Sequence, residues 1–240
     1  MPTKVASITD PGRVRRTNED NFFADEALGL FIVADGMGGH AGGEIASQIA
    51  IATISELMIA GLTEANPDGL IRNAIEQANT AIQAQAEADP TLHGMGTTLV
   101  LAVCRGDAIH LAHLGDSRAY LIHNGSIQRL TEDHSLVAQM VKSGQLSAAE
   151  APRFHLRNVV TRSLGNQKLT EPDLAVVEWN AGDFLLLCTD GLTNMVEDSE
   201  LRSLISGSGA DLERSCREAI ERANQNGGRD NITAVLAYHE

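Results

Sequence analysis

Five aspartates share a local pattern that could gather several carboxylates at one place in the fold. Four of them lie at an end of an apolar, strand-like run, and four have a glycine within two residues: Asp20, Asp35, Asp116, Asp190 and Asp230. Carboxylates that converge at one edge of a sheet cannot all stay ionised without compensation, and oxygen ligands select Mg²⁺ or Mn²⁺ over zinc or copper. A single Asp-Gly is usually a turn. It is the repetition after strongly apolar runs that indicates a divalent metal site.

The glycine-rich segment "FIVADGMGGHAGGE" offers a second interpretation, a loop that binds the pyrophosphate of a dinucleotide. The Gly-x-Gly-x-x-Ala spacing that begins at Gly36 has the strand–glycine–helix form of that fingerprint. However, Asp35 stands where the pyrophosphate would approach, and two helical segments follow with no returning parallel strand. Glu56, at the distance expected for a ribose-binding carboxylate, falls in mid-helix rather than at a strand end. The context therefore favours a metal site over a nucleotide-dependent oxidoreductase.

The composition indicates a globular, acidic chain. With 240 residues, 43% of them hydrophobic, it is long enough to bury the core of one domain, residues 1–240. Its net charge of -14 argues against nucleic acid as a partner, and it would repel an anionic substrate unless local cations reverse the field. Two divalent ions would add +4 and change the formal charge from -14 to -10. A metal site would thus also attract an anionic substrate.

The three cysteines, Cys104, Cys188 and Cys216, have no metal-ligand spacing and lie among apolar neighbours. We interpret them as buried thiols in a reducing compartment. The start of the chain lacks the apolar core of a signal peptide, and no run approaches the roughly 18 apolar residues of a membrane span. We therefore expect a cytoplasmic protein that contacts no membrane, and we further expect a monomer.

Apolar runs and short turns predict an antiparallel sheet structure. The expected strands are residues 97–103, 108–113, 118–123, 126–130, 184–188 and 232–238. Asn124-Gly125 between two of them is a strong hairpin signal. Helical spacing of apolar residues predicts helices at 44–60, near 71–82 and near 212–223. This order of elements favours an α+β layered domain, in which the more polar segment 135–167 forms a helical insertion or flap.

Seven blocks carry a resemblance to a known family, and they occur in that family's order: "RRTNEDNF", "VADGMGGHAGGE", "GMGTTLV", "HLGDSRAY", "TEDHSLV", "CTDGLT" and "GGRDNIT". They span nearly the whole chain. The sequence resembles the metal-dependent serine/threonine protein phosphatases of type 2C, the PPM family, in their compact bacterial form. This resemblance implies a four-layer α/β/β/α sandwich of two antiparallel β-sheets flanked by helix pairs. It places the metals at one end and a small flap at about 135–167.

The resemblance also implies the metal ligands. Asp35 would bridge two core ions, and the carbonyl of Gly36 would ligate the second. Asp190 and Asp230 would ligate the first. Asp116, together with Asp190, would hold a third and weaker ion. The expected cofactors are therefore Mn²⁺ or Mg²⁺, as two core ions plus a third.

Further matching positions have supporting roles in the family. Asp20 would act through metal-bound waters with Glu19 beside it, and Asn231 would belong to the same water network. Arg15 matches the arginine that grips the substrate phosphate. Without the family match, Arg15 would be one of three solvated basic residues near the N-terminus.

Three residues have weaker assignments. His40 is a general-acid candidate, but Met37-Gly38-Gly39 separate it from the Asp-Gly pair, unlike the eukaryotic pattern, so a metal-bound water near Asp116 is the alternative. Thr161 lies on the flap and is a candidate for substrate contact. His134, in "EDHS", either abuts the flap or belongs to the start of a helix.

The implied activity is hydrolysis of phosphoserine and phosphothreonine monoesters. A hydroxide that bridges two divalent metals would attack phosphorus in line with the leaving alkoxide. The substrates would be phosphoproteins, in particular targets of a partner serine/threonine kinase. The alternative is a pseudophosphatase that binds phosphoproteins without hydrolysing them, and the retention of Asp35, Asp190 and Asp230 argues against it.

Overall fold

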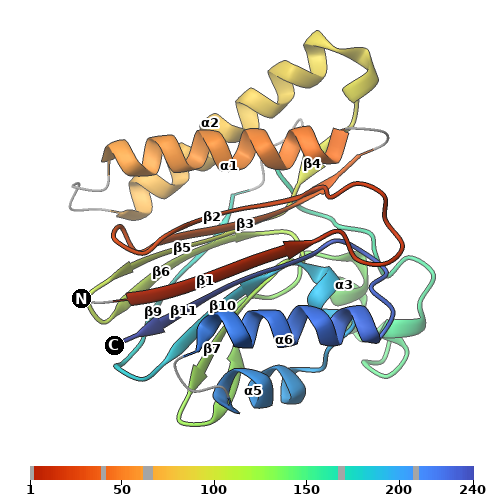
Figure 1. Ribbon diagram of the computed structural model, residues 1–240. Coiled ribbons are helices and arrows are strands. Elements are labelled where there is room, and N and C mark those ends of the chain that lie inside the picture. Colours follow the sequence, from red (N-terminus) through yellow and green to blue (C-terminus); the bar gives the residue numbers. More distant parts are fainter. Residues whose placement is uncertain (1–2, 39–41, 62–66, 167–170, 208–210) are drawn as a thin grey trace.

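Two antiparallel β-sheets packed face to face form the centre of the molecule (Figure 1). The computed structural model describes residues 3–38, 42–61, 67–166, 171–207 and 211–240. One sheet has the strand order β1 (Thr3–Asp10), β11 (Ile232–His239), β10 (Phe184–Cys188), β7 (Arg118–His123), β8 (Ser126–Arg129). The other has the order β2 (Asp20–Asp25), β3 (Leu30–Met37), β5 (Leu99–Arg105), β6 (Ala108–Leu114), β9 (Asp173–Glu178), and β4 (Gly96–Thr97) pairs with β3. All of these pairs are antiparallel, as predicted.

Helices cover the outer face of each sheet, which completes four layers (Figure 1). The six-stranded sheet is covered by α1 (Gly42–Gly61) and α2 (Pro67–Ala88), and η1 (Pro90–Leu92) follows them. The five-stranded sheet is covered by α4 (Asp190–Thr193), α5 (Asp198–Gly207) and α6 (Leu212–Gln225). The predicted α/β/β/α sandwich is confirmed.

The alternation of side chains along each strand builds three apolar layers. In β5, Leu99, Leu101 and Val103 point toward α1 and α2, whereas Val100 and Ala102 point toward the other sheet. Successive residues of a strand face opposite sides of a sheet, so an unbroken apolar run is what a strand covered on both faces needs. The layer between the sheets fixes their relative position, and with it the position of the loops at their ends.

Helix α1 is long and apolar enough to cross a membrane, judged by length and composition alone. In the fold, its buried apolar side chains belong to the cluster shared with α2 and the six-stranded sheet: Ala46, Ala50, Ile51, Ile54 and Met58. This packing between two apolar neighbours accounts for the composition of the helix.

The connection between β8 and β9 contains the segment predicted to be a flap. It includes α3 (Leu136–Lys142) and η2 (Ala151–Arg153). Ser135 caps α3 by accepting a hydrogen bond from the Ala138 amide, so "DHS" does mark a helix start. Isolated bridges Ser135↔Val160 and Thr97↔Leu164 attach the segment at its base. Its assignment as a subdomain within a single domain stays a prediction.

Candidate metal centre and active site

The five aspartates meet at one end of the sandwich, although they come from both sheets. Asp20 and Asp35 are cross-strand partners in β2 and β3. Asp116 lies in the link that crosses from β6 in one sheet to β7 in the other. Asp190 begins α4 directly after β10, and Asp230 lies two residues before β11. The sandwich therefore brings together residues that are far apart in sequence.

Four of these carboxylates line one cavity of ≈ 210 Å³. The lining includes Asp35, Asp116, Asp190 and Asp230, and it also includes Arg15, Glu19 and Gly36. Asp20 lies beside this cavity and is 5% exposed. The predicted aspartate and glutamate ligands, and Gly36, therefore lie in or against a single hollow.

Asp20 is held by two threonine hydroxyls that the sequence interpretation did not assign to the site. Its Oδ2 accepts hydrogen bonds from Thr189 Oγ1 at 2.8 Å and from Thr233 Oγ1 at 2.7 Å. Its Oδ1 is buried and has no partner among the described residues. A buried carboxylate oxygen without a donor is costly, so this atom indicates a place for a water molecule or cation.

Gly36 lies where the end of β3 meets the start of α1. A Cβ there would be 2.0 Å from the carbonyl oxygen of Gly43 and 2.6 Å from that of Glu19. Gly36 N also donates to Glu19 O at 3.1 Å. Only glycine fits this crowded position, which leaves the backbone at the cavity wall.

Without bound cations, the site would disfavour its own negative charges. Burial, aided by neighbouring aspartates, raises the pKa of Asp116 to about 7 and that of Asp190 to about 6. Burial likewise raises the pKa of Asp20 to about 7, and burial with four neighbouring aspartates raises the pKa of Asp35 well above its usual range. Divalent cations would remove this penalty. The oxygen-only donors, the unpartnered Asp20 oxygen and the Gly36 crowding all fit Mg²⁺ or Mn²⁺.

Arg15 reaches the same cavity from the N-terminal loop. Its Nη2 donates to Asp230 Oδ2 at 2.9 Å, and its side chain is 50% exposed. The guanidinium therefore lies at the mouth of the carboxylate cluster, with half of its side-chain surface exposed to a ligand. Arg15 differs in this respect from its exposed neighbour Arg16, which does not line the cavity.

Glu19 and Asn231 hold the loop that carries Arg15. Asn231 Oδ1 accepts from the Glu19 amide at 2.8 Å, and its Nδ2 donates to the carbonyls of Pro11 at 3.1 Å and Thr17 at 2.9 Å. The side-chain amide of Asn231 therefore anchors this loop, and one lone pair of its Oδ1 is left for a water molecule. The role of Asn231 in a water network stays a prediction.

The two weakest assignments have different outcomes. His40 lies outside the described residues. The Thr161 hydroxyl donates to His134 O at 3.0 Å and accepts from Gln139 Nε2 at 2.9 Å. From this limb of the flap, the described residues that line the aspartate cavity are Asn158 and Val160. Substrate contact by Thr161 stays a prediction, and the sequence interpretation missed these two neighbours.

A larger cavity of ≈ 790 Å³ adjoins the first and shares Asp116, Asn158 and Asp190 with it. The flap contributes apolar residues to its wall, Val137, Ala138, Val141, Ala148 and Ala151, beside charged Lys142 and Arg157. The wall also carries charged residues of β7, β8 and the segment after them, including Arg118, Arg129, Glu132 and Asp133. The aspartate cavity thus opens into a space large enough for several amino-acid residues.

Comparison with known proteins supports one class. The family described as Protein phosphatase 2C matches residues 13–237. The chain is 40% identical over 238 residues to the serine/threonine phosphatase stp of Listeria monocytogenes, covering 97% of this chain and 94% of that protein. The crystal structure of the Mycobacterium tuberculosis serine/threonine phosphatase PstP/Ppp is 37% identical with a TM-score of 0.92 and covers 99% of both chains. The catalytic domain of PstP in complex with two manganese ions gives 37% identity and a TM-score of 0.88, covering 98% of this chain and 97% of that one.

The sandwich fold and its carboxylate cavity define a metal-dependent hydrolase of phosphoric monoesters. The chain belongs to the protein phosphatase 2C family of serine/threonine phosphatases. This family supports a catalytic enzyme rather than a pseudophosphatase.

Proposed function

We propose that the aspartate cavity is the place where this chain removes phosphate from phosphoserine and phosphothreonine in proteins. The observation that carries the proposal is the convergence of five carboxylates, four of them with raised pKa values, around one ≈ 210 Å³ cavity. A site that disfavours its own charges in the absence of metal is suited to bind divalent cations and, through them, a phosphate dianion.

Two core ions would be held by Asp35, the Gly36 carbonyl, Asp190 and Asp230, and a weaker third ion by Asp116 with Asp190. When bound, such ions neutralise phosphate charge and activate water by Lewis acidity. Mn²⁺ and Mg²⁺ accept the same oxygen ligands, so the proposal includes both.

Other residues would orient the reactants. Asp20, with one oxygen fixed by Thr189 and Thr233 and the other free, would accept a hydrogen bond from a water in the cavity. The flanking residues of the phosphoprotein would occupy the adjoining ≈ 790 Å³ cavity beneath the flap. That space distinguishes a protein substrate from a small phosphate ester, and targets of a partner kinase are the expected source.

The proposal is tested by removing the metal. Chelator-treated protein should hydrolyse neither p-nitrophenyl phosphate nor a phosphothreonine peptide, and Mn²⁺ should restore both activities. Mg²⁺ at matched concentrations is the comparison that ranks the two ions. Turnover that persists in excess chelator, or none with any divalent ion, would contradict the proposal.

Arg15→Ala is expected to lower kcat/KM for p-nitrophenyl phosphate by about 10- to 100-fold. A hydrogen bond between a guanidinium and phosphate is worth about 1.5–3 kcal/mol, and the Arg15 side chain lies at the mouth of the cavity. Arg15→Lys should recover only part of the loss, because an ammonium cannot form the planar fork.

The matched control is Arg16→Ala, since Arg16 is an exposed neighbour with the same charge. It should change kcat/KM less than twofold. Equal losses in the two alanine variants would show that Arg15 acts only through the general field of the N-terminal loop.

A further inference from the structure

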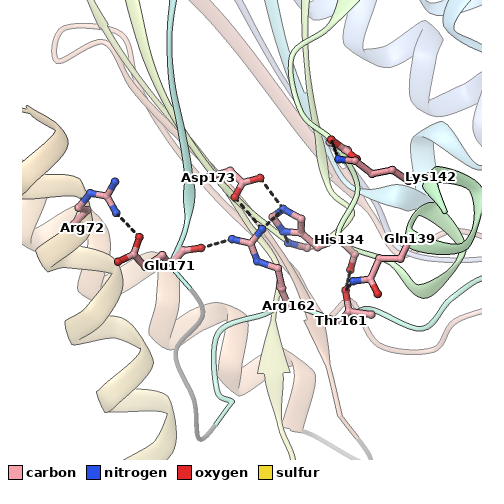
Figure 2. Close-up of polar contacts among 10 residues, drawn as sticks. Arg72, His134, Gln139, Lys142, Thr161, Arg162, Glu171 and Asp173 are labelled. Carbon is pink, nitrogen blue, oxygen red and sulfur yellow. Dashed lines mark hydrogen bonds and ion pairs between the residues drawn. The ribbon is translucent and has the colours of Figure 1, made fainter.

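Several charged and polar side chains contact one another at the base of the flap, where it meets β9 (Figure 2). Arg162, on the limb of the flap that returns to the core, donates from Nη1 to Asp173 Oδ1 at 2.8 Å and from Nη2 to the Glu171 carbonyl. Asp173 is the first residue of the edge strand β9. Its Oδ2 lies 3.0 Å from His134 Nε2, and Arg162 Nη1 lies 2.7 Å from the same ring nitrogen. Arg162, Asp173 and His134, which we call the flap clamp, therefore fasten the flap to β9.

His134 also connects the flap clamp to the link that carries Asp116. Its Nδ1 accepts a hydrogen bond from the Gly115 amide at 3.1 Å, and its own amide donates to Gly115 O at 2.7 Å. Gly115 directly precedes Asp116, and its φ of 111° with a Cβ position 2.6 Å from Thr98 leaves it little freedom to shift. One side chain and one backbone amide thus fix the residue before a predicted metal ligand.

The backbone of His134 also binds the returning limb of the flap. Its carbonyl accepts from the Thr161 amide at 2.8 Å and from the Thr161 hydroxyl at 3.0 Å. Gln139 of α3 donates to the same hydroxyl at 2.9 Å (Figure 2). Consequently, His134 is the one described residue bonded to the Gly115 link, to the returning limb and to Asp173 together.

His113, His134 and Asp173 would also suit a metal ion by type, since their ligand atoms lie within 4.8 Å of one another. The hydrogen bonds argue against this. The Gly115 amide can only donate, so His134 Nδ1 is the acceptor and the ring proton lies on Nε2. Nε2 is then a donor to Asp173 and cannot ligate a cation. A guanidinium can also only donate, so the 2.7 Å approach of Arg162 Nη1 to Nε2 is not a hydrogen bond. Both donors face the Asp173 carboxylate, and the guanidinium already places positive charge there.

The ring of His113 packs against the ring of His134. The two ring centroids are 4.4 Å apart, and His113 is 2% exposed, with no partner for either nitrogen among the described residues. Burial lowers the pKa of His113 to about 4, so this ring is neutral. It acts as a packing surface that keeps the neutral His134 ring in its orientation.

We propose that the flap clamp positions two parts of the site at once. It fastens the base of the flap to β9, and it holds the link that carries Asp116, the carboxylate expected to bind the third ion. This inference rests on the proposed function. Asp116 and Asn158 line both cavities. The flap clamp holds the link that carries Asp116 and the returning limb that carries Asn158. Loss of Arg162 should therefore loosen the returning limb and weaken binding of the weakest ion.

The test compares Arg162→Met with Arg72→Met as the matched control. Arg72 also contacts the Glu171 region, but only through an exposed 3.6 Å pair with the Glu171 carboxylate (Figure 2). Such a pair contributes little. Arg162→Lys is the conservative variant, since an ammonium can reach Asp173 but cannot fork to the Glu171 carbonyl as well.

Two readouts are needed. Amide hydrogen exchange of residues 134–140 and 156–164 in the metal-free protein reports on the flap base without any turnover. The Mn²⁺ concentration for half-maximal activity, with kcat at saturating Mn²⁺ and KM measured separately, reports on Asp116. Calorimetric titration with Mn²⁺ gives the affinity of the weakest site directly.

Arg162→Met should speed exchange of both segments about 10-fold and raise the half-activating Mn²⁺ concentration by about 10-fold or more, as loss of a supporting partner of a metal site does. kcat should return to within about threefold at saturating Mn²⁺. Arg162→Lys should be intermediate, and Arg72→Met should match the unchanged protein within twofold.

Wild-type exchange in Arg162→Met would overturn the flap clamp. Faster exchange with unchanged Mn²⁺ affinity would also overturn the proposal, because it would reduce Arg162 to an anchor with no influence on Asp116. If the unchanged protein has no phosphatase activity, the proposed function fails, while exchange and calorimetric Mn²⁺ binding still decide the coupling.

Discussion

Asp35→Asn is expected to reduce kcat on p-nitrophenyl phosphate by about 1000-fold at saturating Mn²⁺. Asp35 lines the cavity near the end of β3, and burial together with four neighbouring aspartates raises its pKa. An amide keeps its shape but loses the charge that two cations would share. Metal ions contribute several kcal/mol to such reactions, and about 4 kcal/mol corresponds to 1000-fold in rate.

The same variant should be more stable than the unchanged protein when both are metal-free. Burial and repulsion disfavour the Asp35 charge, so replacing it with a neutral amide relieves the free energy of the folded state. We expect Tm to rise by a few degrees while activity is lost, a trade-off common at active sites. Scanning calorimetry in chelator, together with steady-state kinetics, measures both quantities.

Asp107→Asn is the control, because Asp107 lies in the β5–β6 turn and its side chain is 66% exposed. It should leave activity and Tm nearly unchanged. Substantial activity in Asp35→Asn at any Mn²⁺ concentration would show that the five carboxylates are not the metal centre.

Strands covered on both faces were predictable because their apolar runs are unbroken. β10 matches the prediction at both ends, and β11 extends one residue beyond it. β1, β2 and β9 were missed, because these edge strands lack an unbroken apolar run. The hairpin at Asn124-Gly125 is confirmed by positive φ angles of 48° and 72°, which that turn requires.

The site residues were predictable where a carboxylate lies at the end of a strongly apolar strand. They were less predictable where a neutral side chain supports such a carboxylate. Asp190 and Asp230 were found in this way. Thr189 and Thr233 were not, because a threonine in a strand is ordinarily a strand former, and only the folded partner Asp20 shows that both hydroxyls converge. The flap clamp depends on contacts between β6, β9 and the flap, which no local pattern encodes.

The stability of the metal-free protein should fall as pH rises from 6.5 to 8.0. The pKa of Asp20 and that of Asp116 are raised to about 7, whereas both are near 4 in an unfolded chain. The folded state therefore holds protons that the unfolded state has already lost, and its stability decreases as those protons leave. Two such carboxyl groups losing their protons around pH 7 should lower Tm by about 3–6 °C.

Mn²⁺ should reverse this trend, because cations take the place of the protons. A ligand that binds only the folded state adds stability according to its concentration relative to Kd, and protons compete for the same oxygens. The rise in Tm caused by Mn²⁺ should thus be larger at pH 8.0 than at pH 6.5.

The interval starts at pH 6.5 because, at lower pH, the titration of His113 changes the stability in the opposite direction. Its pKa is lowered to about 4 by burial, so below about pH 6.5 the unfolded chain binds the extra proton and stability increases with pH. The Asp20→Asn variant isolates the carboxylate part: it removes one of the two groups and should roughly halve the loss of Tm between pH 6.5 and 8.0. A metal-free Tm that rises or stays level over this interval in the unchanged protein would mean that the aspartates keep ordinary pKa values, and the electrostatic reason for metal binding at this cavity would be lost.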